Sequence, residues 1–419
     1  MSQSKVCVLG LGYIGLPTAA ILATNGFQVV GVDTNEDVVD TLNNGEVHID
    51  EPGLRTMVQA GFNSGNLQAR SEPEEADVFV IAVPTPLQGE EPDVSYIESA
   101  AVSISKYLKE GNLVINESTS PPKTTEETVR PILEESGLSA GKDFYLSYCP
   151  ERVLPGSIMK ELTENDRIIG GVNDESAQKA REVYEEFVEG DIYLTDATTA
   201  EFVKVMENTY RDVNIALANE IAGVSEELGV DAWEAIELAN RHPRVDFLRP
   251  GPGVGGHCIP IDPWFIIDQA REETPLLQMS RDINDFQSER VVEMVEGMVE
   301  AVKEPKITIL GVAYKGNVED TRETPALSVL EKLEGSGYEV SVVDPHVKDF
   351  PYDLVNHEQA FRGSDCAVLL TDHEEFTEIQ PDEMGELMHA EKILDTRNLL
   401  DHESWESAGF EVRRFGVSG

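Results

Sequence analysis

Residues 5–33 read KVCVLGLGYIGLPTAAILATNGFQVVGVD: a short apolar strand, a glycine-rich turn, a helical pattern, a second strand and an aspartate, in that order. The turn has the form GxGxxG, with its glycines at Gly10, Gly12 and Gly15. Gly10 permits the turn, Gly12 lets the backbone meet a pyrophosphate, and Gly15 allows close packing of helix on strand. The helix that follows offers free N–H donors and a positive dipole end to phosphates. The stretch therefore predicts a Rossmann-type dinucleotide site that includes Tyr13 and Ile14.

The aspartate that ends this stretch selects the cofactor. Asp33 follows the second strand, where a carboxylate bonds the ribose 2′-hydroxyl of NAD and repels the 2′-phosphate of NADP. We therefore expect NAD. The alternative is a glycine-rich turn in an unrelated α/β domain, and the strand, helix, strand and acid around the turn disfavour it.

Further strands follow, and three of them end in polar residues and prolines. Ligands bind at the carboxyl ends of strands in open α/β sheets, so these residues are candidates for the same site. Plain turn chemistry is the alternative. The strands are expected at residues 77–83, 113–115 and 144–148, and the candidates that follow them are Pro84, Thr85, Thr119, Glu151 and Arg152. Strands at 167–171 and 192–195 would complete this domain.

Residues 197–228 predict one long helix, with apolar residues at helical spacing and Gly223 as the only breaker. Such a helix suits a connection between domains and a dimer surface. Lys204 and Asn208 lie one turn apart on one face of it. Lysine is scarce in this acidic chain, so Lys204 is a candidate site residue, with a solvated surface lysine as the alternative. Shorter helices are expected at 232–239 and 276–302.

A second unusual stretch, RPGPGVGGHCIPIDPWF, spans residues 249–265. Its glycines and prolines predict a tight loop that is neither helix nor central strand. Glycines let the backbone approach a ligand closely, and the single cysteine, Cys258, is a candidate nucleophile, with Asp262 four residues later. A rigid turn with an incidental thiol is the alternative.

A second α/β unit begins after Glu304 and Pro305. A strand at 306–310 leads into the turn Gly311–Lys315, which lacks the GxGxxG pattern, so this half is expected to bind the ligand other than nicotinamide. The fold class is therefore α/β, with two Rossmann-like domains joined by a long central helix and a helical middle domain. The expected domains are 1–196 for NAD, 197–304 for the central helical part with the cysteine loop, and 305–419 for the second ligand.

Composition narrows the class of protein. The 419 residues include 79 acidic and 32 basic side chains, for a formal charge of −47, which disfavours binding to nucleic acid and anionic membranes. A charge this large also suggests a halophilic source, where salt screens the repulsion. No segment reaches the ~20 apolar residues of a membrane helix, and the start does not read as a signal peptide. The four cysteines lack metal-site or CxxC spacing, so we expect a reduced, cytoplasmic protein without metal or structural disulfides.

Several motifs together resemble the UDP-glucose/GDP-mannose dehydrogenase family across nearly the whole chain. They are GLGYIGLP (10–17), VPTP (83–86), EST (117–119), CPERVLPG (149–156), AEFVKVMENTY (200–210), GPGVGGHC (251–258) and GVAYKGNVEDTRETPAL (311–327). The resemblance implies a four-electron oxidation in which a sugar C6 alcohol becomes a carboxylate and two NAD are reduced. An aldehyde has no second hydride ready until a nucleophile adds to it, which explains the need for a cysteine.

The resemblance assigns roles to the catalytic candidates. Cys258 would form a thiohemiacetal and then a thioester, while Lys204 and Asn208 would stabilise the oxyanion on O6. Asp262 would hold or deprotonate a water together with Lys204. Glu151 would guide the hydrolytic water, unless it only partners Arg152, and Thr119 would orient that water or the nicotinamide.

The substrate contacts also follow from the resemblance. Arg244 would reach the nucleotide sugar across a dimer interface, and Lys315 and Arg322 would contact it from the C-terminal domain, since cations suit a pyrophosphate. The other substrate-binding candidates are Arg152, Gly255 and His257, of which His257 is also explained as a satisfied imidazole in a tight loop.

Within the family, residues 240–265 resemble the UDP-N-acetylmannosamine dehydrogenases most closely. UDP-N-acetylglucosamine 6-dehydrogenases, which share GGHC, are the nearest alternative, and UDP-glucose dehydrogenases differ at His257 and Ile261. Two alternatives of other classes stay open. One is a two-electron hydroxyacid or sugar-phosphate dehydrogenase, which needs no loop cysteine. The other is a non-catalytic nucleotide-sugar sensor on the same fold.

Overall fold

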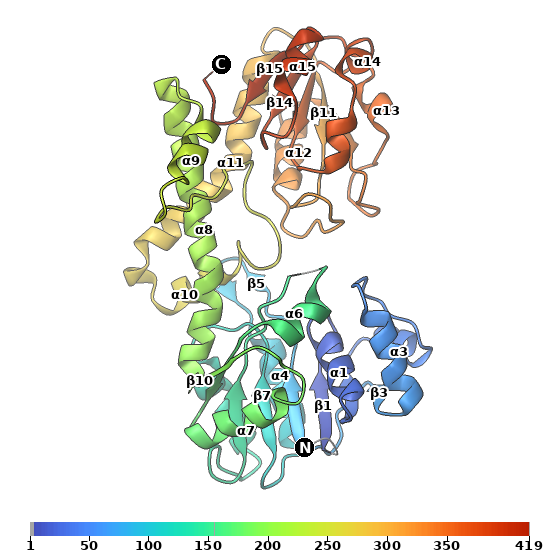
Figure 1. The fold of residues 1–419 in the computed structure, drawn as a ribbon, viewed down its shortest axis with the longest axis vertical. Helices are drawn as coiled ribbons and strands as arrows, with labels where there is room; N and C mark the ends of the chain where they lie inside the picture. The colour runs from blue at the N-terminus through green and yellow to red at the C-terminus, as the bar shows by residue number, and fades with distance from the viewer. Residues whose placement is uncertain (1–3, 155, 419) are drawn as a thin grey trace. The chain divides into compact units, whose positions relative to one another are not determined.

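The computed structural model describes residues 4–154 and 156–418 (Figure 1). Backbone contacts divide the chain into two compact units: unit 1, Met1–Glu207 with Trp264–Arg271, and unit 2, Asn208–Pro263 with Glu272–Gly419. Among the described helices, none has both the length and the apolar character that a membrane crossing requires.

Unit 1 is built on an eight-stranded sheet in the order β10-β9-β8-β7-β4-β1-β2-β3. All neighbouring strands pair in parallel except β8 and β9, which are antiparallel. The strands are β1 (Lys5–Leu9), β2 (Gln28–Val32), β3 (Leu67–Arg70), β4 (Val78–Ile81), β7 (Leu113–Asn116), β8 (Tyr145–Tyr148), β9 (Arg167–Gly171) and β10 (Ile192–Asp196). A separate hairpin joins β5 (Leu87–Gln88) and β6 (Glu91–Pro92).

Both faces of this sheet are buried, each under its own apolar cluster. Successive side chains of a strand point to opposite faces, so one strand can contribute to both clusters. In β1, Val6 and Val8 enter one apolar cluster, while Cys7 and Leu9 enter another. The first cluster is completed by α1 (Gly15–Thr24), α2 (Glu36–Asn43), α3 (Leu54–Ser64), α6 (Ile158–Glu164) and α7 (Asp174–Tyr184). The second is completed by α4 (Ser95–Ser105), the π-helix η1 (Thr124–Val129) and α5 (Arg130–Glu134).

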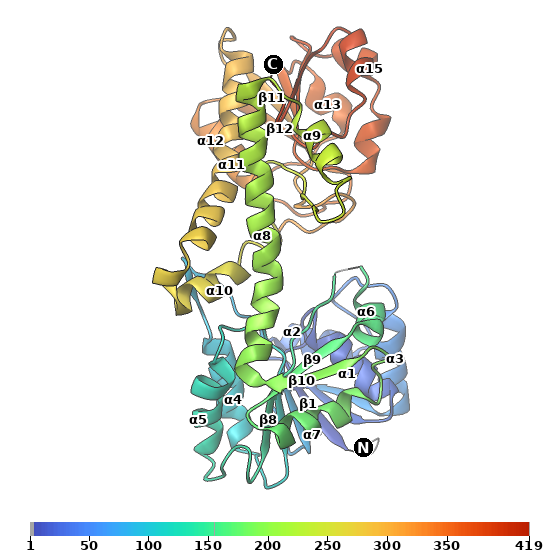
Figure 2. The same ribbon diagram turned by 60° about the vertical axis from the view of Figure 1, so that its left-hand side comes forward.

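The long helix predicted at 197–228 is present as α8 (Ala197–Leu228), the green helix of Figure 2. In unit 2, α8 and α11 (Pro275–Val299) share a buried polar contact in which Arg281 pairs with Asp212, and both side chains are almost fully buried. The short helix α9 (Ala232–Ala239) also matches its expected range.

Unit 2 contains a second sheet of five parallel strands in the order β12-β11-β13-β14-β15. The predicted α/β fold with two Rossmann-like sheets is therefore confirmed. The strands are β11 (Lys306–Leu310), β12 (Glu339–Val343), β13 (Cys366–Leu369), β14 (Lys392–Asp395) and β15 (Glu411–Arg414). The helical elements that accompany them are α12 (Pro325–Gly335), α13 (His357–Phe361), η3 (Glu374–Glu378), α14 (Pro381–Gly385) and α15 (His402–Ser407).

The first turn of unit 2 repeats the glycine turn of unit 1, although its sequence lacks GxGxxG. Gly10 and Gly311 have φ values of 93° and 91°, which glycine adopts readily. Gly10 N–H donates to Val32 O and Gly311 N–H to Val343 O, both at 2.8 Å. The two turns are therefore the same structural device on two sheets.

The cysteine stretch differs from the sequence expectation at its end. The expected loop to residue 265 stops at Ile261, because α10 (Asp262–Gln269) begins at Asp262. Proline suits the first turn of a helix, where its missing N–H would have no intrahelical partner. Pro263 therefore starts a helix where it was taken to prevent one. The short 3₁₀ turn η2 (Arg271–Glu273) follows.

Candidate active site

The three glycines of the first turn are required for different reasons. A Cβ on Gly10 would lie 2.3 Å from Ala82 O, and one on Gly15 would lie 1.9 Å from Gly10 O. A Cβ on Gly12 would meet no protein atom within 4 Å. Packing therefore explains Gly10 and Gly15, whereas Gly12 leaves open space at the start of α1. That space fits a cofactor pyrophosphate that approaches the backbone.

Asp33, which the sequence predicts as the ribose contact, accepts two backbone hydrogen bonds. Its Oδ2 accepts a hydrogen bond from Leu11 N–H at 3.0 Å, and its Oδ1 accepts one from Asn35 N–H at 2.9 Å. The carboxylate is thereby fixed beside the glycine turn. Tyr13, in the turn itself, has an exposed ring.

The ends of β4 and β7 meet beside this turn. Val83 N–H donates to Ser118 Oγ at 2.9 Å, which joins the VPTP and EST segments. Thr85 is buried, and its hydroxyl oxygen has no hydrogen-bond partner among the described residues. A buried hydroxyl without a partner is costly and suits a bound ligand. Pro84 is exposed and Thr119 is half-buried.

Glu151 is buried, and its charged partner is Arg167 rather than Arg152. Glu151 Oε2 lies 3.0 Å from Arg167 Nη1, and Arg152 contributes only a backbone N–H to Oε1, at 2.7 Å. The Arg152 side chain instead pairs with Glu207 at 2.8 Å and donates to Asp166 O. Glu151 is therefore not merely a partner of Arg152, although it accepts a hydrogen bond from the Arg152 backbone.

Lys204 is buried, at 8% exposed, so the alternative of a solvated surface lysine is also wrong. One turn further along α8, Asn208 donates from Nδ2 to Asp262 Oδ2 at 2.6 Å. Asp262 is 2% exposed at the start of α10, and its N–H donates to Cys258 O at 2.9 Å. A single turn of chain thus links Cys258 to the Asn208–Asp262 pair within unit 2.

The cysteine loop needs its glycines because it lies against the first turn of the second sheet. A Cβ on Gly255 would lie 2.7 Å from Tyr314 Cβ, and one on Gly256, whose φ is 88°, would lie 2.9 Å from the Tyr314 ring. Gly256 N–H also donates to Arg322 O at 2.9 Å. Cys258 itself is exposed. Packing against Tyr314 is therefore a second reason for these glycines, beside close approach to a ligand.

Of the predicted cations in unit 2, Arg322 has a carboxylate partner: it bonds Asp320 through Nε and Nη2 at 2.6–3.1 Å. Although burial favours the neutral acid, these bonds hold the pKa of Asp320 below its usual value. Lys315, Arg244 and His257 are all exposed.

Sequence reasoning missed two residues that hold this loop. Gly251 N–H donates to Asn219 Oδ1 on α8 at 2.9 Å. Arg397, just after β14, fills the space beside Gly251, where a Cβ would lie 2.8 Å from its Nη1, and it donates from Nη2 to Tyr314 O at 3.4 Å. A clue for Arg397 exists in the sequence, since polar residues after a strand were singled out in the first half of the chain. The clue for Asn219 exists only in three dimensions.

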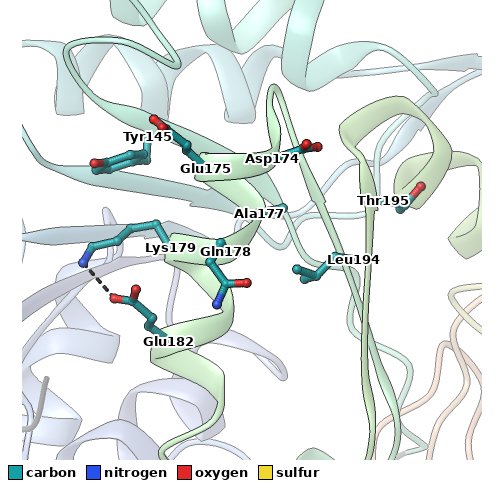
Figure 3. Close-up of a pocket in the computed structure, with 9 residues that line it drawn as sticks. All are labelled: Tyr145, Asp174, Glu175, Ala177, Gln178, Lys179, Glu182, Leu194 and Thr195. Atoms are coloured by element: carbon teal, nitrogen blue, oxygen red, sulfur yellow. Dashed lines mark hydrogen bonds and ion pairs between the residues drawn. The ribbon is translucent and has the colours of Figure 1, made fainter.

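Two other features lie apart from these residues. His346, His373 and Glu375 approach one another closely enough to share a metal ion, but both ring nitrogens of His373 are occupied, by Asn317 N–H and by Asp344 Oδ2. We therefore assign no metal there. A surface hollow of about 620 Å³ in unit 1 is lined by Tyr145, by α7 from Asp174 to Glu182, and by the end of β10 (Figure 3). It contains no predicted site residue, and its Lys179 pairs with Glu182 at 2.8 Å.

The sequence matches three consecutive domains of one family. They are the NAD binding domain (residues 4–188), the central domain (198–286) and the UDP binding domain (308–402) of the UDP-glucose/GDP-mannose dehydrogenase family. The chain belongs to this family. It is thus an NAD-dependent oxidoreductase of the UDP-sugar dehydrogenase class, and the turn at Gly10 lies in the part of the chain that matches the family's NAD binding domain.

Similar proteins point to a narrower group. A UDP-N-acetyl-D-mannosamine dehydrogenase of Methanococcus aeolicus is 50% identical over 99% of this chain and 95% of its own length. An NDP-N-acetyl-D-galactosaminuronic acid dehydrogenase of Ralstonia nicotianae is 45% identical over 94% and 96%. The solved structure of UDP-D-ManNAc dehydrogenase from Pyrococcus horikoshii superposes with a TM-score of 0.93, at 43% identity, over 98% of this chain and 99% of that one.

Proposed function

We propose that this protein oxidises the C6 alcohol of UDP-N-acetyl-D-mannosamine to the carboxylate, with two NAD reduced for each sugar. The observation that carries the proposal is the exposed Cys258 on a loop that is linked to the pair formed by half-buried Asn208 and buried Asp262. A two-electron dehydrogenase has no use for such a thiol, and a sensor has no use for the buried lysine, amide and carboxylates that accompany it.

Each residue has a role in this proposal. The Cys258 thiolate adds to the C6 aldehyde and forms a thiohemiacetal, whose oxidation gives a thioester. Lys204 and Asn208, one turn apart on α8, stabilise the negative charge on O6. Asp262, whose carboxylate already accepts from Asn208, is the base with Lys204 in the first oxidation. Glu151 guides the water that hydrolyses the thioester, and Thr119 orients that water or the nicotinamide.

NAD, when bound, accepts the hydride in each of the two oxidations. Gly10, Gly12, Tyr13, Ile14 and Gly15 would hold its pyrophosphate. Its ribose and nicotinamide would be held by Asp33, Pro84, Thr85 and Thr119.

The negative pyrophosphate of the substrate needs basic side chains to bind it, and this chain has few of them. Lys315 and Arg322 lie in the segment between β11 and α12, and Arg397 follows β14. Arg244 would be supplied by a second copy of the chain. Gly255 and His257 would contact the sugar. Arg152 is less suited to contact the substrate, since its guanidinium is already bonded to Glu207 and Asp166.

We also propose a homodimer, which the surface of α8 supports. Several large apolar residues of this helix are exposed and recur at intervals of four and seven, which keeps them on one face. They are Phe202, Met206, Tyr210, Leu217, Val224 and Leu228. A second copy would cover this face; light scattering should give twice the chain mass, and Leu217→Glu should give the monomer mass. We also propose three domains, at residues 1–196, 197–304 and 305–419. The proposal includes a cytoplasmic location and a halophilic source.

The test is the number of NADH formed per sugar, in molar KCl. UDP-N-acetylmannosamine, UDP-N-acetylglucosamine, UDP-N-acetylgalactosamine and UDP-glucose are compared, and the first should give two NADH at the highest kcat/KM. Cys258→Ser should not release the uronate, whereas the control Cys366→Ala, which removes a buried thiol from unit 2, should keep the two-to-one ratio. One NADH per sugar, or full turnover by Cys258→Ser, would sink the covalent route.

A further inference from the structure

A buried charged cluster in unit 1 remains outside the roles given so far. Arg167 begins β9 and is 4% exposed, and Glu117 follows β7 and is 3% exposed. With Glu151, the cluster contains one guanidinium and two carboxyl groups. Burying an arginine is expensive unless it is well paired, so its position calls for an explanation.

Arg167 is held from several sides. Its Nη2 donates to Leu162 O at 3.2 Å, and its guanidinium lies 4.9 Å above the Tyr184 ring. Its Nη1 lies 3.0 Å from Glu151 Oε2 and 3.8 Å from Cys149 Sγ. A planar group with this many restraints has one orientation, and the carboxylate that it contacts is fixed with it.

The carboxylate of Glu151 keeps an acceptor for a further partner. The contact of Oε2 with Arg167 is an ion pair without hydrogen-bond alignment, and within the described residues Oε2 has no hydrogen-bond donor. A void of about 10 Å³ lies beside it, lined by Glu151, Arg152, Asn165 and Arg167 among others. This is about the space that one water molecule needs, and the lining is polar.

The second carboxyl group of the cluster, Glu117, is linked to Arg167 through the side chain of Tyr184. Tyr184 donates from its hydroxyl to Glu117 Oε1 at 2.5 Å, and Thr18 donates to Glu117 Oε2 at 3.3 Å. Thr18 lies on α1, the helix of the NAD turn. The chain of contacts from α1 through Glu117, Tyr184 and Arg167 therefore ends at Glu151.

We propose that Arg167 is a positioning residue for thioester hydrolysis: it holds the Glu151 carboxyl group turned toward a water, and Glu117 and Tyr184 hold Arg167 in place. This inference rests on the proposed function. In the step concerned, the water oxygen attacks the C6 acyl carbon, Glu151 takes a water proton, the C–S bond breaks, and the thiolate of Cys258 leaves. No oxidation occurs in this step, so a fault in Glu151 alone should spare both NADH-forming steps.

The experiment uses the full-length enzyme with excess NAD and UDP-N-acetylmannosamine, mixed rapidly. Arg167→Met should still form two NADH per active site in a burst, and its steady-state kcat should fall about 10- to 100-fold. KM for the sugar should fall in parallel, because kcat/KM reports only the steps up to the acyl-enzyme. Intact-protein mass spectrometry should show the nucleotide-sugar acyl group on the enzyme. Arg167→Lys keeps the positive charge but replaces the planar guanidinium with an ammonium group, and it should recover part of the steady-state kcat. Arg181→Met, which removes an exposed arginine paired with Glu185, is the matched control and should not change kcat.

The outcomes separate this inference from the function beneath it. If the parent enzyme forms no NADH from any UDP-sugar, the proposed function fails. If the parent forms two NADH but Arg167→Met loses its burst in parallel with turnover, or turns over normally, Arg167 does not act through hydrolysis. Should Arg167→Met not fold, Arg167→Lys decides: acylated enzyme at steady state supports the inference, and free enzyme overturns it.

Discussion

Gly12 and Gly15 belong to one motif but should respond differently to the same change. Gly15→Ala places a Cβ 1.9 Å from a backbone oxygen that no rotamer can relieve, so it should cost at least about 3 kcal/mol of folding free energy. Gly12→Ala meets no protein atom, so the melting temperature should stay the same while the KM for NAD rises about tenfold or more. Calorimetry and steady-state kinetics check this pair, and a stable Gly12→Ala enzyme with unchanged KM would show that the backbone does not approach the cofactor there.

Glu117 should make stability depend on pH. Burial raises its pKa to about 7, against the opposing pull of Arg167, while in the unfolded chain it titrates near its usual 4.5. Between these values the folded protein holds a proton that the unfolded chain has lost, so this contribution to stability declines as pH rises from 4.5 to 7. The decline amounts to roughly 3 kcal/mol.

Glu117→Gln imitates the protonated acid and should remove that decline. Denaturant unfolding from pH 4.5 to 8 in molar KCl gives the free energy of unfolding of the parent and of the variant. Their difference isolates the contribution of Glu117, because the contributions of other groups cancel. One such group is Glu201, whose pKa burial also raises to about 7. Glu72→Gln, on the exposed surface, is the control and should follow the parent. Parallel curves for Glu117→Gln and parent would contradict the buried titration.

At the scale of elements, the packing of α11 on α8 depends on a buried ion pair. Arg281 and Asp212 are 2% and 0% exposed, and Asn284 also donates to Asp212 at 2.8 Å. Arg281→Met would leave a buried carboxylate without its cation and should cost about 3–5 kcal/mol. The double variant Arg281→Met/Asp212→Leu should recover most of that loss.

Denaturant unfolding of the single and double variants tests this pair. The control is Arg241→Met, because Arg241 and Glu237 form an exposed pair one turn apart, worth little in water. If Arg281→Met lowered the free energy of unfolding as little as Arg241→Met does, the packing of α11 on α8 would not depend on the buried ion pair.

The elements that the sequence predicted well are those whose signal is local. α8 and β11 were predicted with their bounds as observed, because helical spacing and apolar runs are properties of the chain itself. The start of α10 was missed because the loop's prolines were read only as breakers. The contact of Arg167 with Glu151 was missed because it depends on the antiparallel pairing of β8 and β9, which no local pattern encodes. Likewise, Asn219 became a candidate only once the cysteine loop lay against it, whereas Arg397 follows a strand and so had a clue in the sequence.

At the scale of the whole molecule, a formal charge of −47 should make stability depend on salt. The carboxylates repel one another, and the Debye length falls from ~10 Å at 0.1 M to ~3 Å at 1 M salt. Screening alone should therefore be nearly complete by about 1 M. Because we propose a halophilic source, we expect the melting temperature and the activity to keep rising with KCl beyond that concentration, through the hydration of the carboxylates.

The salt response can be tied to the charges by removing some of them. Glu72, Glu110 and Glu135 are exposed in unit 1. Changing all three to glutamine should raise the melting temperature in dilute buffer and bring its plateau to lower KCl, since fewer charges need screening. Thermal scans from about 0.1 to 3 M KCl compare the parent with the triple variant, in a range where the Debye length is already ~10 Å or less. A melting temperature that peaks in dilute buffer and falls in molar KCl would contradict a halophilic origin, and an unchanged curve for the triple variant would show that surface charge does not set the response.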